Sequence, residues 1–141
     1  MHKKILIPLF CIAAFLGSSF GLVYAKPTGA LQTSSGVFTF VPKLCGIHKE
    51  GDFYDIEVHG AGVAPGGEKV YVEFSSTADA LDVNFGVDSM LASSDTTLQS
   101  EGQLQIRVDG KKIRAIEIKL VDQDRRVVDA NATLEIDCSL T

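Results

Sequence analysis

Tryptophan is absent from the chain of 141 residues, and histidine and cysteine occur only three times each. The missing tryptophan argues against a true antibody-type domain, in which this side chain packs on the disulfide. Basic residues are also scarce, with 13 Lys and Arg against 18 Asp and Glu. We therefore expect no nucleic-acid partner, because such a partner requires a basic surface.

Residues suited to catalysis are equally few. Nucleophilic catalysis usually needs a Ser or Cys beside a histidine base, and only His48 and His59 lie outside the first 25 residues. Within residues 26–141 there is no Gly-x-Ser-x-Gly motif and no Cys-x-x-Cys pair. We expect that the protein is not an enzyme and that it carries no cofactor.

The first 25 residues have the pattern of a secretory signal peptide. Lys3 and Lys4 give a basic start, residues 5–25 carry no charge, and Ala25 ends a small-residue cleavage pattern. The apolar stretch over residues 5–16 is about 18 Å long as a helix, against about 30 Å of hydrocarbon to span. An uncleaved membrane anchor is therefore the weaker alternative.

Cleavage before Lys26 leaves a chain of residues 26–141 that we expect in the bacterial periplasm or medium. Loss of Lys3 and Lys4 changes its formal charge from −5 to −7. We expect no stable membrane insertion after cleavage. The remaining cysteines, Cys45 and Cys138, are predicted to form a disulfide, because an even pair in an oxidising compartment is most simply oxidised. The alternative, two metal-binding or catalytic thiols, lacks the usual close spacing.

Apolar and polar residues alternate along most of the mature chain, which is typical of strands with one buried face. The alternating segments are 37–41, 54–59, 70–74, 81–87, 103–109, 116–120 and 133–138, with 127–128 as a short extra strand. Asp109-Gly110 predicts a tight hairpin, and residues 65–67 and 122–124 predict turns. Cys138 falls on the inward side of the last strand.

Seven or eight strands without a convincing helix predict an all-β domain over residues 37–141. We expect an antiparallel β-sandwich of immunoglobulin-like architecture with Greek-key-like connections, and a small β-barrel is the alternative. The signal peptide at 1–25 is the one helical segment expected. Residues 26–36 are interpreted as a flexible lead-in.

Two surfaces could bind a partner. Residues 50–101 contain 11 acidic residues and a single base, Lys69, which predicts an exposed acidic sheet face for a cationic partner, or simply a solvated surface. The longest gap between predicted strands, about 88–102, could form a binding loop. Its candidate contact residues are Met90, Leu91, Ser93, Ser94, Thr96, Thr97 and Gln99.

The favoured function is an exported, non-enzymatic binding or interaction module for an unknown protein or surface glycan. A calcium- or other ligand-carrying domain is the alternative. Its weak candidate ligands are Glu50, Asp52 and Asp55, because hard cations prefer oxygen donors. We otherwise predict no metal site, since His48 and His59 alone do not complete a tetrahedral zinc set.

Overall fold

The computed structural model describes residues 26–77, 80–86 and 96–141, and these ranges form nine strands and no helix. The strands are β1 (Gly29–Thr33), β2 (Gly36–Glu50), β3 (Phe53–Val63), β4 (Lys69–Thr77), β5 (Ala80–Gly86), β6 (Thr96–Ser100), β7 (Ile106–Asp109), β8 (Lys112–Val121) and β9 (Val127–Asp137). The prediction of an all-β fold is confirmed. In the described part of the chain, no helix is long and apolar enough to cross a membrane.

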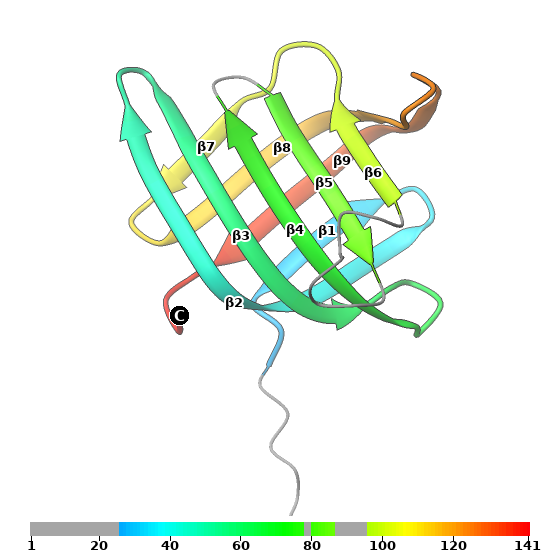
Figure 1. Cartoon of the computed structure of the whole chain (residues 1–141), viewed down its shortest axis with the longest axis horizontal. Helices are drawn as coiled ribbons and strands as arrows, with labels where there is room; N and C mark the ends of the chain where they lie inside the picture. Colours follow the sequence, from blue (N-terminus) through cyan, green and yellow to red (C-terminus); the bar gives the residue numbers. More distant parts are fainter. Residues whose placement is uncertain (1–25, 78–79, 87–95) are drawn as a thin grey trace, which may run out of the picture.

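The strands form one antiparallel sheet that closes on itself (Figure 1). Hydrogen-bonded neighbours follow the order β6-β5-β4-β3-β2-β1-β9-β8, and β6 also pairs with β8 through Gln99 opposite Val121. Strand β7 pairs with the other end of β8. The fold is therefore the barrel alternative and not the expected β-sandwich. An alternation of period two shows that one face is buried, but it does not distinguish two stacked sheets from one closed sheet.

The long strands β2 and β3 make the closure possible. Strand β2 has 15 residues, pairs with β1 in its first third, and continues along β3 after a bulge between Pro42 and Leu44. At Gly62 the two backbones approach so closely that a Cβ would lie 1.9 Å from the Thr39 carbonyl oxygen. Glycine and a bulge are the usual means of bending a strand. The bend lets β2 belong to both walls of the barrel.

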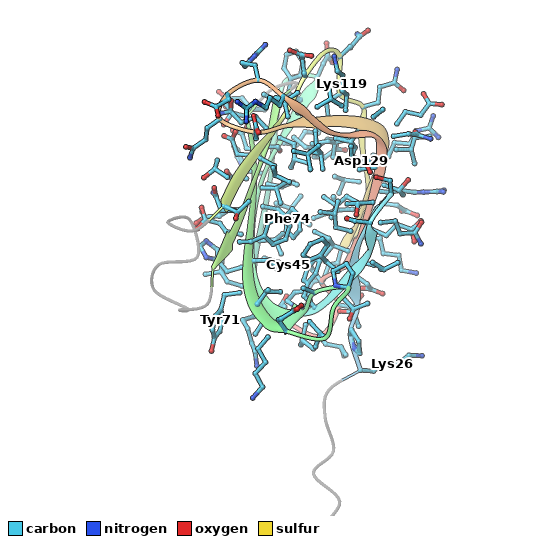
Figure 2. The ribbon with its side chains drawn as sticks, turned by 90° about the vertical axis from the view of Figure 1, so that its right-hand side faces the viewer. Lys26, Cys45, Tyr71, Phe74, Lys119 and Asp129 are labelled. Atoms are coloured by element: carbon cyan, nitrogen blue, oxygen red, sulfur yellow. A yellow bond between two sulfur atoms is a disulfide. The ribbon has the colours of Figure 1, made fainter. Side chains whose placement is uncertain are left out.

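The core fills the space between these walls. Phe40 and Phe74 stack with ring centroids 5.1 Å apart, and both side chains are fully buried. Figure 2 shows Phe74 pointing into the interior, while Tyr71, three residues earlier on β4, points away from it. The parity predicted from the sequence therefore holds for β4.

The lead-in expected over residues 26–36 is wrong, because residues 29–33 form β1 in the middle of the sheet. Strand β1 pairs with both β2 and β9, and Leu31 is fully buried. Only five residues long, it offers too little alternation to stand out in the sequence. Ahead of Gly29, Thr28 accepts a hydrogen bond from the Asp137 amide, and beyond that point β2 and β9 converge.

The predicted disulfide between Cys45 and Cys138 is confirmed and lies at this convergence. The Cα atoms of the two cysteines are 6.1 Å apart, and Cys138 is buried as its parity predicted. The sulfur bridge thus joins the two strands where β1 no longer lies between them.

Three other local predictions are tested by the strand pairing. Gly110, with φ 58°, supports the predicted hairpin between β7 and β8, in which Asp109 faces Lys112. The alternation over residues 116–120 predicts that Ile116 is buried with Ile118 and Leu120. This is wrong for Ile116, since a bulge at Glu117 (φ 55°) leaves its side chain 43% exposed. Residues 127–128 are the start of β9 and not a separate strand.

Candidate functional site

The outer surface of β3, β4 and β5 carries four carboxylates on neighbouring strands, and we call these residues the acidic face. They are Asp55, Glu57, Glu73 and Asp82. Strand register brings them together, because Glu57 lies opposite Ser75, which in turn lies opposite Asp82. All four follow the outward parity, alternating with buried residues of the core.

A histidine lies among these carboxylates. His59 is on β3, two residues from Glu57 and directly opposite Glu73 on β4. Its Nε2 atom is 2.9 Å from Glu57 Oε1, and its Nδ1 atom is 3.9 Å from Glu73 Oε2. The Glu57 side chain remains 64% exposed, so His59 leaves it accessible to a partner.

A shallow hollow of about 480 Å³ runs beside the acidic face. Its floor crosses from β2 to β4, and Gly46, which faces Glu57 in the register, contributes no side chain. Asp55, Glu57 and Glu73 provide carboxylates, and Ser75 and Thr77 are among the other residues that line it. The hollow is therefore open, with three carboxylates and with apolar lining from Ile47 and Ile56. Such a surface suits a cationic side chain with an apolar stem.

The opposite wall of the barrel has a different charge distribution. There Arg107 faces Arg114 across β7 and β8, and Asp109 faces Lys112. Arg114 Nε is 3.1 Å from Glu135 Oε1, so acids and bases on this wall partly neutralise each other. The pairing of β3, β4 and β5 thus brings four acidic residues of the segment 50–101 to one side of the barrel, whereas Glu101 pairs with Lys119 of β8.

Only part of the predicted binding loop falls in the described residues. Met90, Leu91, Ser93 and Ser94 lie outside the described residues. Thr96, Thr97 and Gln99 belong to β6 and not to a loop, because this segment pairs with β5. With five residues, four of them polar, β6 has a composition typical of a loop, and its pairing with β5 shows that it is a strand.

The place of β6 in the sheet connects the loop candidates with the acidic face. Gln99 lies opposite Asp82 and Thr97 lies opposite Asn84, so both extend the outer surface of β5. One outward row consequently crosses five strands. It contains Gly46, Glu57, Ser75, Asp82 and Gln99.

The three weak metal-ligand candidates are not brought together. Asp55 lines the hollow, Glu50 ends β2, and Asp52 lies in the turn that follows. Within residues 26–77, 80–86 and 96–141, no group of three His, Cys, Asp or Glu side chains could hold a metal ion. His48 lies in β2 opposite Asp55 and lines the same hollow.

Sequence reasoning missed the association of His59 with Glu73. Both residues follow the outward parity of their own strands, and this was the available signal. Which strands are neighbours, and in what register, could not be read from the alternation. Comparisons of the chain with protein-family models, curated proteins and solved structures find no match, so the chemistry of its own residues carries the functional argument.

Proposed function

We propose that this chain is an exported, non-enzymatic binding module whose acidic face holds a positively charged segment of another protein. The observation that carries the proposal is the grouping of Asp55, Glu57, Glu73 and Asp82 on adjacent strands. No two of these carboxylates are directly opposite in the register, but Glu73 is diagonal to both Glu57 and Asp82, so like charges repel across adjacent strands. A cationic partner would relieve this repulsion and so gain affinity.

The shape of the surface supports the same kind of partner. Gly46 and Ser75 flank Glu57 in the outward row and leave room beside its carboxylate. A lysine or arginine side chain could enter the hollow there and keep its charge in contact with water. Exposed charge pairs of this kind mainly increase the association rate and the specificity, and salt weakens them.

Two residues that could take part in catalysis already have other bonding partners. Cys45 is part of a disulfide, and the side-chain hydrogen bond of His59 goes to Glu57. This supports a binding role over nucleophilic catalysis, which needs a free nucleophile beside its base.

Export is part of the proposal, because the disulfide is compatible with an oxidising compartment. We propose that residues 1–25 direct the chain to the periplasm or the medium. The intact mass of the protein recovered from either compartment should correspond to residues 26–141 less two hydrogens. A mass that still includes Met1 contradicts cleavage.

Binding to the acidic face can be tested with an oligolysine peptide of about ten residues, titrated calorimetrically into the mature protein at low and high salt. Gly46→Lys places a competing cation beside Glu57. The strand has room for it, since a Cβ at Gly46 would lie 3.7 Å from its nearest neighbour. Gly46→Ala is the matched control for the backbone change.

We expect Gly46→Lys and Glu57→Gln to weaken peptide binding about tenfold, and high salt to weaken binding by the wild type. Gly46→Ala and Glu135→Gln, on the opposite wall, should bind as the wild type does. Equal affinity of all four variants would mean that the acidic face is a solvated surface and not a binding site.

A further inference from the structure

Strand β2 has an unpaired edge over its second half. Residues 36–40 pair with β1 on one side, and residues 39–50 pair with β3 on the other. From Lys43 to Glu50, therefore, β2 has a paired strand on the β3 side alone in the described part of the chain. Figure 1 shows this edge at the left margin of the sheet that contains β2, β3 and β4.

A groove of about 450 Å³ lies beside this edge. On the β2 side it is lined by Lys43, Leu44, Cys45 and Ile47. The other side comes from the β7–β8 turn and the end of the chain, and its residues are Gly110, Lys111, Cys138 and Thr141. Leu44 is 51% exposed and offers apolar surface to an occupant.

An unpaired strand edge presents a row of amide and carbonyl groups, and another extended chain satisfies them best. Adjacent strands lie about 4.8 Å apart, so a strand inserted between two others needs a separation of about 9.6 Å. Cys45 and Cys138 are only 6.1 Å apart at Cα. The disulfide therefore blocks pairing at Cys45 and leaves residues 46–50 as the accessible edge.

Charge selects the type of strand that fits. Residues 26–49 contain Lys26, Lys43 and Lys49 and no acid. On the accessible edge itself, Lys49 and Glu50 offset each other, so the charge that selects an occupant comes from the lysines of the groove. Lys43 and Lys111 both line the groove, so carboxylates on an incoming strand would meet two positive charges.

We propose that this edge binds an extended, acidic segment of another protein by strand addition. The backbone of the segment pairs with residues 46–50 of β2. One of its apolar side chains packs in the groove against Leu44 and Ile47, and its carboxylates lie near Lys43 and Lys111. Gly46, Ile47 and His48 also line the hollow beside the acidic face, so the two sites adjoin. The edge site is distinguished by its strand pairing and by Lys43 and Lys111, and it does not depend on the function proposed above.

The test uses the mature, disulfide-bonded protein and a synthetic peptide of about eight residues, the length of an ordinary strand, in which Val alternates with Glu. Two further versions of the peptide carry N-methyl groups on one or the other alternate set of amides. Strand addition uses one set, so one version should lose binding and the other should retain it. Amide shifts on titration should be concentrated in residues 46–50.

A second experiment reverses the charge of the lysines that line the groove. We expect Lys43→Glu and Lys111→Glu to weaken binding of the Val-Glu peptide about tenfold, whereas Lys69→Glu on β4 should leave it unchanged. A Val-Lys peptide should bind the wild type more weakly than the Val-Glu peptide. No saturable binding of the Val-Glu peptide, equal effects of the two methylated versions, or shifts confined to β3–β5 would overturn the proposal.

Discussion

The disulfide makes the strongest stability prediction. In the double variant Cys45→Ala/Cys138→Ala, strands β2 and β9 lose the covalent link at the end of the barrel where β1 no longer separates them. Cys138 is fully buried, yet replacing it with alanine removes only one sulfur atom from the core. The main effect should therefore arise from the unfolded chain, which gains freedom when the cross-link is absent.

The size of the effect follows from the loop that the bridge closes. The cysteines are 93 positions apart, and the chain-entropy relation for such a loop gives about 4.6 kcal/mol at 25 °C. A domain of ordinary stability unfolds with about 5–15 kcal/mol. For the 116 residues after Ala25, a loss of this size corresponds to a decrease in Tm of about 15–20 °C.

Because the chain has no tryptophan, the assay is urea unfolding followed by far-UV circular dichroism, with the fluorescence of Tyr54 and Tyr71 as a second probe. The wild type, the reduced wild type and the double variant are compared. The reduced wild type keeps both sulfur atoms and so separates cross-linking from packing. Unfolding free energies that differ by less than about 1 kcal/mol among the three would refute the entropic argument.

Three further changes test the packing and the charges. Gly62→Ala should lower the unfolding free energy by about 2–3 kcal/mol, since its Cβ would lie 1.9 Å from a backbone oxygen, while Gly46→Ala should have little effect in the same urea titration. Phe74→Ala removes a fully buried ring and should cost about 3–5 kcal/mol, with Tyr71→Ala on the outside as the milder comparison. Hydrogen bonding and charge from Lys119, with a contribution from Arg125, lower the pKa of Glu101 below its ordinary 4.5. The stability that the ionised Glu101 contributes is thus present above pH 4.5 and is lost as the pH falls through the lowered pKa. We therefore expect Glu101→Gln to have a lower Tm than the wild type at neutral pH. In acid the Tm values of the two proteins should become equal. Equal Tm values for the two proteins at pH 7 would contradict the role of this ion pair.

Much of the barrel could be predicted from the sequence, because burial alternation and turn residues depend only on neighbouring positions in the chain. Alternation over residues 70–74 correctly predicted that Phe74 is buried, and the parity of the last strand correctly placed Cys138 in the core. The hairpin at Asp109-Gly110 depends on the φ of a single glycine, which its dipeptide signals.

The errors concern positions where local pattern and tertiary pairing disagree. Leu31 is buried because β1 fits between β2 and β9, strands that are distant from each other in sequence. Ile116 is exposed because a bulge changes the parity of β8 halfway along its length. Neither feature changes the residue pattern enough to be recognised beforehand.

The candidate sites could likewise be predicted only in part from the sequence. Acidic residues are concentrated in one stretch of sequence, so a negative surface could be expected from composition alone. Strand register decided that Glu57, Glu73 and Asp82 share one face with His59. The unpaired edge of β2 could not be predicted, since it depends on where β1 ends relative to its neighbours.

The amino-acid sequence by itself therefore determined the all-β class, the buried side of most strands and the pairing of the two cysteines. The tertiary structure alone decided that the sheet closes as a barrel, where its charges gather and which strand edge stays open. The physical reason is that burial periodicity is a property of each segment, whereas closure and edges depend on hydrogen bonds between strands such as β6 and β8 that no segment specifies alone.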